Sequence, residues 1–222
     1  MNISPFARPV YVMLKPAGPV CNLACDYCYY AEKSKLYPSA KNHILTEELL
    51  EKFIKEYIEC QTMQDVLFTW HGGEALMRPI SFYKRALELQ QRYAQGKRIA
   101  NCIQTNGTLL TDDCKFFKDN NFLVGISIDG PQEFHDEYRR NRQGLPSFYK
   151  VMKGINLLKK HGVEYNGMAV VNDYNVDYPH EFYQFFKDID CHYIQFSPIV
   201  ERIGQHKDGT LLGSPGQDSD EV

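Results

Sequence analysis

The stretch VYVMLKPAGPVCNLACDYC, residues 10–28, joins an apolar run to three closely spaced cysteines. The run from Val10 to Leu14 ends at Lys15-Pro16, which predicts a buried strand followed by a loop. A strand that is apolar on both faces is typical of a parallel sheet covered by helices. We therefore expect the cysteine loop to follow the first strand of an α/β fold.

The same alternation of strand and helix continues along the chain. Apolar runs predict strands at 66–70, 99–104, 122–128, 164–171 and 193–200, and helical patterns predict helices at 46–58, 81–93, 111–120, 147–161 and 179–188. Such a series forms a parallel sheet that is either open or curled into a barrel. We expect one folded domain over residues 1–203, and a disordered tail or truncated linker over the polar residues 204–222.

Composition narrows the class of protein. The chain has 222 residues, 43% of them hydrophobic, which is typical of a globular protein with a core. A formal net charge of −3 indicates neither a nucleic-acid partner nor a membrane surface, and no apolar run is long enough to span a bilayer. Without a signal peptide, the seven cysteines indicate a reducing, cytoplasmic location. Four of them are scattered and are expected to be small core residues: Cys60, Cys102, Cys114 and Cys191.

The three clustered cysteines carry the strongest chemical signal. Cys21, Cys25 and Cys28 have C-x3-C-x2-C spacing, which can bring three thiols to one inorganic centre. Iron–sulfur clusters are commonly held by four cysteine thiolates, so three would leave one iron open to a substrate or cofactor. Two alternatives remain, namely a zinc site completed by a histidine and thiols that are only structural.

A second polar cluster follows the strand at 66–70. His71 precedes Gly72-Gly73, where the backbone can approach a ligand closely, and the Glu74 carboxylate can accept hydrogen bonds from an ammonium group. Loops at the carboxyl ends of parallel strands meet at one edge of the sheet, where ligands bind. The alternative is a plain turn with a solvated glutamate.

Further polar residues end the next two strands. Ser127 and Asp129 offer a hydroxyl and a carboxylate that suit ribose hydroxyls, and the Arg139 guanidinium could pair with a carboxylate. Gln104 could contact a substrate peptide or only shape its turn. The alternative for Ser127 is a plain turn residue, and at least one of Arg139 and Arg140 is expected to be merely solvated.

These motifs together resemble a known family. The three cysteines with Tyr27 before the third resemble the radical S-adenosylmethionine enzymes. The full set resembles the anaerobic sulfatase-maturating enzymes over about residues 8–204, and it comprises Lys15-Pro16-Ala17, residues 21–30, His71-Gly72-Gly73-Glu74, Gln104-Thr105-Asn106-Gly107, residues 125–131 and Gln195-Phe196. The resemblance implies a partial (β/α)6 barrel of the TIM type.

The resemblance also implies ligands for particular residues. Cys21, Cys25 and Cys28 would hold a [4Fe–4S] cluster. S-adenosylmethionine would be contacted by Tyr27, the Gly72-Gly73-Glu74 motif, Ser127, Asp129, Arg139 and the backbone around Val200. Tyr30 and His71 would face the substrate peptide, although glutamine is expected in place of His71 in some members of the family.

The implied reaction is oxidation of a cysteine or serine of a sulfatase to Cα-formylglycine. A 5′-deoxyadenosyl radical would abstract hydrogen from the substrate Cβ, with flavodoxin or ferredoxin as electron donor. The family continues into a C-terminal domain with two auxiliary clusters and the proposed catalytic base. We therefore expect a truncated chain with no certain catalytic residue of its own. A related radical peptide-modifying enzyme and a non-catalytic metal-binding fragment remain as alternatives.

Overall fold

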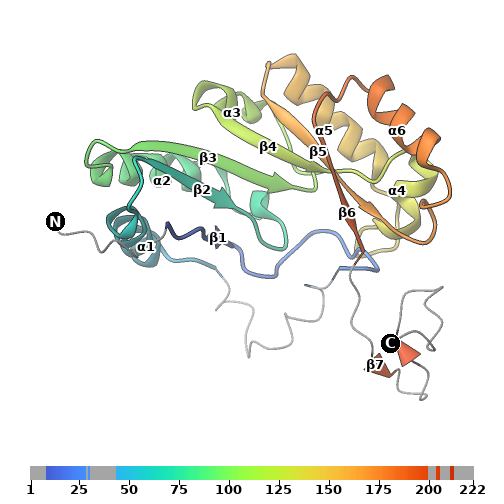
Figure 1. Ribbon diagram of the computed structural model, residues 1–222, viewed down its shortest axis with the longest axis horizontal. Coiled ribbons are helices and arrows are strands. Elements are labelled where there is room, and N and C mark those ends of the chain that lie inside the picture. The colour runs from blue at the N-terminus through green and yellow to red at the C-terminus, as the bar shows by residue number, and fades with distance from the viewer. Residues whose placement is uncertain (1–8, 29, 31–43, 200–203, 206–210, 213–222) are drawn as a thin grey trace.

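The computed structural model describes residues 9–28, 30, 44–199, 204–205 and 211–212 (Figure 1). Its centre is a sheet of six strands in sequential order, and every neighbouring pair is parallel. The strands are β1 (Met13–Leu14), β2 (Asp65–Trp70), β3 (Arg98–Thr105), β4 (Phe122–Ser127), β5 (Tyr165–Val171) and β6 (Ile194–Pro198). β1 and β6 are the two edges, so the sheet formed by the described residues is not closed, and the expected α/β fold with a partial barrel is confirmed.

Helices connect the strands. They are α1 (Glu47–Cys60), α2 (Ile80–Tyr93), α3 (Lys115–Asp119), α4 (Gln132–Tyr138), α5 (Phe148–Lys160) and α6 (Pro179–Asp188), with short 3-10 turns η3 (Ala75–Met77) and η4 (Asp112–Cys114). Figure 1 shows α2, α3, α5 and α6 on one side of the sheet. The described residues contain no helix long and apolar enough to cross a membrane.

Two elements differ from the sequence expectation. α4 was not expected, because it is only seven residues long and follows directly on the Gly130-Pro131 turn. β1 is shorter than the apolar run at 10–14, because the backbone of Val10 bonds side chains at the end of α1, from Tyr57 in the helix and Gln61 just after it, instead of a strand. Val10 N donates to Gln61 Oε1 over 3.3 Å, and the Tyr57 hydroxyl donates to Val10 O over 3.1 Å.

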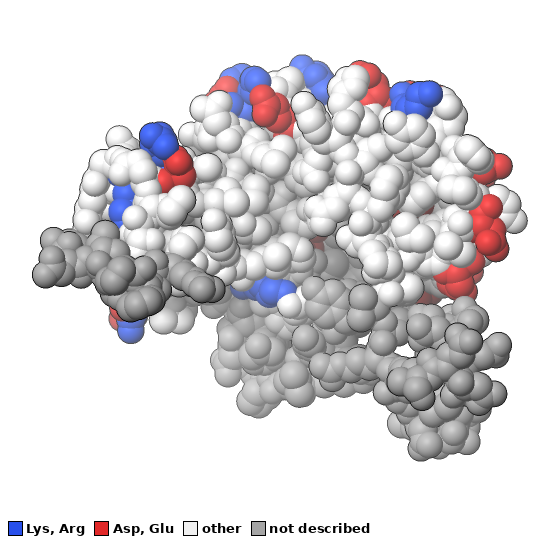
Figure 2. Space-filling model, in the orientation of Figure 1, with Lys and Arg blue, Asp and Glu red and all other residues white. Residues whose placement is uncertain are grey.

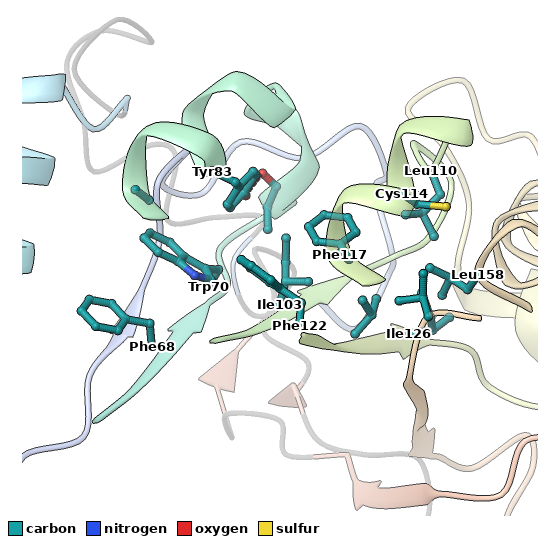
Figure 3. Close-up of a cluster of buried hydrophobic side chains, with 14 of the residues drawn as sticks. Phe68, Trp70, Tyr83, Ile103, Leu110, Cys114, Phe117, Phe122, Ile126 and Leu158 are labelled. Carbon is teal, nitrogen blue, oxygen red and sulfur yellow. Dashed lines mark hydrogen bonds between the residues drawn. The ribbon is translucent and has the colours of Figure 1, made fainter. Parts of the chain in front are cut away.

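The core lies between the sheet and its helices. Side chains of β2 alternate, so that Phe68 and Trp70 are buried against the helices while Leu67 faces the open side of the sheet. Figure 3 shows Trp70 between Phe68 and Tyr83. The buried Tyr83 hydroxyl donates to Ala75 O over 2.6 Å, which fixes the turn after β2 to α2. The core therefore supports the loop that carries Gly72, Gly73 and Glu74.

The remaining expectations for the fold have mixed outcomes. Cys114 and Cys191 are buried and Cys102 is partly buried, but Cys60 is exposed at the end of α1. Within residues 204–222 the structure describes two short strands, β7 (Gly204–Gln205) and β8 (Leu211–Leu212), which pair antiparallel. The domain boundary at 203 stays a prediction. On the surface, Figure 2 shows Lys and Arg side chains beside Asp and Glu along the rim of the molecule.

Candidate functional site

The cysteine loop lies at the carboxyl edge of the sheet and is held first by the backbone that follows β2. His71 N donates to Leu14 O over 2.8 Å, Gly73 N to Gly18 O over 2.8 Å, and Glu74 N to Val20 O over 2.9 Å. A Cβ on Gly73 would lie 2.4 Å from Val20 O, closer than real Cβ atoms come. Gly73 is therefore needed because the cysteine loop packs directly on it.

Glu74 lies inside the fold and is 1% exposed. Its Oε1 accepts from Leu76 N at 2.8 Å and from the Thr105 hydroxyl at 2.6 Å, and its Oε2 accepts from Asn106 N at 2.7 Å. Burial raises the pKa of this carboxyl, and the hydrogen bonds from Asn106, Thr105 and Leu76 oppose that rise. Glu74 thus links the ends of β2 and β3 through its hydrogen bonds. A glutamate in a plain turn would be solvated instead.

Side-chain amides tie the loop to the end of β3. Asn106 Nδ2 lies 2.9 Å from Asn22 Oδ1 and 3.7 Å from Cys21 Sγ, and Asn22 Nδ2 donates to the Thr108 hydroxyl over 2.8 Å. The Thr108 hydroxyl in turn donates to Asn106 Oδ1 over 2.7 Å. Asn106 is thus found to position the first cysteine as well as to shape its own turn.

The other side of the loop is bound by the segment that leaves α4. Ala24 N donates to Arg140 O over 2.8 Å, and Asp26 N donates to Tyr138 O over 3.0 Å. The Tyr27 hydroxyl donates to Asp129 Oδ2. Burial raises the pKa of Tyr27 well above its ordinary value, so the hydroxyl keeps the proton that it donates.

Asp129 and Arg139 form a buried ion pair beside Tyr27. Arg139 Nε and Nη2 donate to the two carboxylate oxygens of Asp129 over 2.7 and 3.1 Å, and Val170 N donates to Oδ1 over 2.9 Å. Asp129 is 0% exposed. Such a bidentate pair fixes both side chains. The sequence expected Asp129 to face a ligand, whereas its carboxylate oxygens are already bonded to Arg139, Tyr27 and Val170.

The three thiols are partly buried, form no disulfide with another described cysteine, and are close enough to affect one another. Burial raises the pKa of Cys25 to about 11, against the positive charge of Arg139, and charges on Cys28 and Cys21 raise it further. Leu23 N donates to Cys21 Sγ over 3.3 Å, a contact that favours the thiolate. A metal centre would have to displace the thiol protons, because thiolates are the ligands.

Three cysteine thiols can each bind a different iron atom of an iron–sulfur cluster. Among the described residues, no group of three or more His, Cys, Asp and Glu converges on a single metal ion. A lone zinc ion needs its sulfur ligands about 2.3 Å away. An iron–sulfur cluster binds each thiolate through a different iron.

Ser127 and Gln104 meet on the open face of the sheet. Gln104 Nε2 donates to Ser127 Oγ over 2.9 Å, passing over Gly125, where a Cβ would lie 2.0 Å from Gln104 Oε1. Gly125 thus leaves the room that Gln104 occupies. Because Ser127 Oγ already accepts this bond, its own proton is available for a ligand.

The two residues expected to face a peptide also lie at this edge. His71 Nδ1 accepts from Gly72 N over 2.7 Å. Burial, followed by the charge of Lys15, lowers the pKa of His71, so its ring is neutral near pH 7. Lys15 Nζ lies 3.3 Å from the centre of the Tyr30 ring. Val200 lies outside the described residues.

Sequence reasoning missed four residues that support the site, namely Asn22, Thr108, His135 and Ser147. Asn22 lies between two of the cysteines, and its position inside the motif was a usable signal. His135 lies one helical turn before Arg139, and that i, i+4 spacing was the signal for it. Ser147 had been expected only to open α5, and nothing in the sequence pairs it with Arg139.

Comparison with known proteins identifies relatives of this arrangement. The model of the radical SAM superfamily matches residues 16–186. The chain is 70% identical over 212 residues to a serine-type anaerobic sulfatase-maturating enzyme of Bacteroides thetaiotaomicron, and covers 51% of it. It is 34% identical over 204 residues to a cysteine-type enzyme of Clostridium perfringens, of which it covers 55%. The chain thus spans about half the length of these relatives.

Solved structures give the same result for the fold. The structure of native anSMEcpe with bound AdoMet and Cp18Cys peptide has a TM-score of 0.79 and 33% identity, covering 88% of this chain and 52% of that one. Streptococcus suis SuiB bound to S-adenosylmethionine has a TM-score of 0.63 at 15% identity, covering 86% of this chain and 41% of SuiB. The second likeness shows a shared fold and no more.

Proposed function

The chain belongs to the radical SAM superfamily, and on that premise we propose that it is the radical-generating part of an anaerobic sulfatase-maturating enzyme. The observation that carries the proposal is the cysteine loop, fixed on one side by Gly73 and Glu74 and on the other by Asp129 and Arg139. Both supports hold the loop at the ligand-binding edge of the sheet.

Cys21, Cys25 and Cys28 would hold a [4Fe–4S] cluster, and S-adenosylmethionine would bind beside it. When bound, the two together supply a 5′-deoxyadenosyl radical able to abstract a hydrogen atom from the substrate. The available Ser127 proton would bind a ribose oxygen. The Arg139 side chain would border the same site, with its charge balanced by Asp129. Tyr27 and the backbone at Gly72 and Gly73 would line the site next to the third cysteine.

Glu74 and Asp129 would act indirectly in this site. Protein donors give the Glu74 carboxylate three hydrogen bonds and the Asp129 carboxylate four, so each would hold the residues that contact S-adenosylmethionine. Tyr30, His71 and Gln104 would border the substrate, and the neutral His71 ring would offer its second nitrogen to the peptide. Val200 would add a backbone contact.

The substrate would be a sulfatase polypeptide whose serine is oxidised to Cα-formylglycine. The 70% identity to a serine-type relative, against 34% to a cysteine-type one, favours serine. Flavodoxin or ferredoxin would donate the electron, in the cytoplasm. These assignments concern the longer enzyme, because the chain spans about half of its relatives.

Anaerobic reconstitution tests the radical-generating step. The 222-residue chain is loaded with iron and sulfide, iron is counted, and S-adenosylmethionine is added with dithionite. We expect about four irons per chain from a [4Fe–4S] centre, together with 5′-deoxyadenosine. Cys25→Ala should lose both, whereas Cys60→Ala, which alters an exposed thiol on α1, should keep both. Bound zinc without nucleoside product would contradict the proposal.

A peptide assay tests the substrate. Matched sulfatase-motif peptides with serine or cysteine at the target position are incubated with the full-length enzyme, and the aldehyde is detected by mass spectrometry. We expect conversion of the serine peptide, and no conversion of a ribosomal-peptide precursor. Modification of the precursor alone would favour a different peptide-modifying enzyme.

A further inference from the structure

Asp129 is bonded through its backbone and through its carboxylate by residues in and directly after α4. His135 lies in α4, and Arg139 directly follows the last residue of the helix, where Arg139 N donates to His135 O over 3.0 Å. The Arg139 guanidinium binds the Asp129 carboxylate, and the His135 ring accepts a hydrogen bond from the Asp129 backbone through Nδ1 at 3.3 Å. The backbone and the side chain of Asp129 are thus fixed by one short helix and the residue that follows it.

The other nitrogen of His135 continues the chain of hydrogen bonds. His135 Nε2 lies 2.9 Å from Ser147 Oγ, and the Ser147 hydroxyl donates to Arg139 O over 2.7 Å. The Ser147 hydroxyl has one proton and donates it to Arg139 O. The proton in the bond between Ser147 Oγ and His135 must therefore come from Nε2. Nδ1 is then the acceptor that the Asp129 N–H requires. All three bonds agree with one neutral tautomer of His135.

Burial supports the same protonation state. His135 is 0% exposed. Burial, followed by the positive charge of Arg139, lowers its pKa to about 3, against a rise from Asp129. A neutral ring therefore persists throughout the physiological pH range, and the hydrogen bonds keep their direction.

Ser147 is free for this role because another residue caps α5. A serine at a helix N-terminus usually accepts a bond from a backbone N–H of the first turn. Here Ser147 makes no such bond, and Asp136 Oδ1 accepts from Ser147 N at 2.8 Å and Phe148 N at 2.9 Å instead. The Ser147 hydroxyl instead satisfies Arg139 O at the end of α4, where carbonyls lack helical partners.

We propose that His135 and Ser147 are positioning residues, whose hydrogen bonds hold the Asp129–Arg139 pair and, through Asp129, the Tyr27 hydroxyl of the cysteine loop. The hydrogen bonds of His135 and Ser147 join α4 and α5 to the end of β4, and both side chains are neutral. This inference rests on the proposed function, since Arg139 and Tyr27 are there assigned to the S-adenosylmethionine site. Neither His135 nor Ser147 is expected to touch the cofactor.

Binding measurements test the role in the site. Ser147→Ala removes both bonds of the hydroxyl, while Ser147→Thr keeps a hydroxyl in place. With the reconstituted chain, we expect Ser147→Ala to raise the Kd for S-adenosylmethionine about tenfold, the scale of one lost hydrogen bond, at unchanged iron content. Ser147→Thr should restore affinity to within about threefold. Equal affinity of Ser147→Ala and wild type would overturn the proposal.

Variants of His135 separate its two bonds. His135→Asn places polar atoms near Nδ1 and keeps the contact with Asp129, and His135→Gln reaches the position of Nε2 and keeps the contact with Ser147. We expect both variants to weaken S-adenosylmethionine binding, because each removes one of the two hydrogen bonds of the His135 ring. His192→Gln, at an exposed histidine, is the matched control and should bind like wild type. Full affinity of both His135 variants would contradict the proposal.

Nuclear magnetic resonance of the metal-free chain tests the bonds themselves. Ring nitrogen shifts of His135 should show a protonated Nε2 and an unprotonated Nδ1 from pH 8 down to pH 5. Hydrogen exchange at Arg139 Nε should be slow in wild type and in Ser147→Thr, and faster in Ser147→Ala. If wild type fails to bind S-adenosylmethionine, the proposed function fails, and the exchange rates still decide the positioning role. A charged ring at pH 6, or equal exchange rates in all three proteins, would overturn it.

Discussion

The cysteine loop is held from two sides by different kinds of interaction. On the side of β2 and β3, the buried Glu74 carboxylate accepts from two backbone N–H groups and one hydroxyl, all of them neutral donors. On the side of α4, the buried Asp129 carboxylate faces the cation of Arg139. The first arrangement spreads one charge over neutral dipoles, whereas in the second a single cation balances the charge, with Tyr27 and Val170 as further, neutral donors.

This difference predicts how each side should respond to substitution. Removing one neutral donor from a buried acceptor costs about 1–3 kcal/mol, and Glu74 would keep its other donors. Removing one member of a buried ion pair costs about 3–5 kcal/mol, because the remaining charge has no compensation. The α4 side should therefore be the more sensitive of the two.

The largest effect is expected for Arg139→Leu. The substitution leaves Asp129 buried and charged without its cation, so the free energy of unfolding should fall by about 3–5 kcal/mol. Urea unfolding of the metal-free chain at pH 7 measures it. The double variant Asp129→Asn with Arg139→Leu removes the charge as well, and should recover part of the loss. A double variant no more stable than Arg139→Leu would show that the ion pair is not the source of the sensitivity.

Gly73→Ala tests the opposite side by steric means alone. The added Cβ would lie 2.4 Å from Val20 O and 2.5 Å from Pro19 O, so the cysteine loop must move. We expect a loss of about 1–3 kcal/mol in stability, the usual cost of overpacking, and less iron bound after reconstitution. Gly96→Asn, at an open position with φ +80°, is the control, because asparagine tolerates positive φ. Normal iron content in Gly73→Ala would mean that close packing there is dispensable.

Much of this architecture follows from the sequence. The strands β2 to β6 are apolar runs separated by amphipathic helices, and that pattern predicts a parallel sheet whose carboxyl edge collects the polar motifs. The spacing of Cys21, Cys25 and Cys28 was sufficient to predict a metal centre at this edge, and the assignment of these ligands stays a prediction. Local sequence determines these features, because hydrophobic periodicity and loop length act over short distances along the chain.

The partners of buried polar groups could not be predicted in the same way. Glu74 next to two glycines suggested a ligand contact, yet two of its three donors, Thr105 and Asn106, lie at the end of another strand. Asp129 likewise finds Arg139 and Val170 only after folding. Which polar groups meet depends on strand register and helix placement, and periodicity does not specify either. α4 could not be predicted, because its seven residues are too few to show a helical hydrophobic repeat.

His135 adds a pH dependence to the α4 side. Its pKa is about 3 in the folded chain, with burial as the main cause, and near 6.5 when unfolded. The unfolded state therefore binds more protons between these values, and stability is lost as pH falls through this window. Between pH 7 and pH 5 the loss from His135 should be about 2 kcal/mol.

Urea unfolding of wild type and His135→Asn at both pH values isolates this contribution. Glu74 has a raised pKa, so its own contribution has the opposite sign and falls as pH rises above its unfolded value. Because Glu74 is present in both proteins, it cancels in the difference between them. Parallel pH profiles for the two proteins would be inconsistent with a neutral, buried His135.

The smallest effect is expected for Thr108→Val on the β3 side. The Thr108 hydroxyl accepts from Asn22 Nδ2 and donates to Asn106 Oδ1, so valine of similar shape removes two hydrogen bonds. Thr108 and Asn22 are only partly buried, and water can replace the lost partners. The free energy of unfolding should therefore fall by only about 1 kcal/mol, with iron content unchanged, and Thr108→Ser should match wild type. A loss as large as that of Arg139→Leu would mean that the neutral network is as critical to the loop as the ion pair, and would remove the contrast between its two sides.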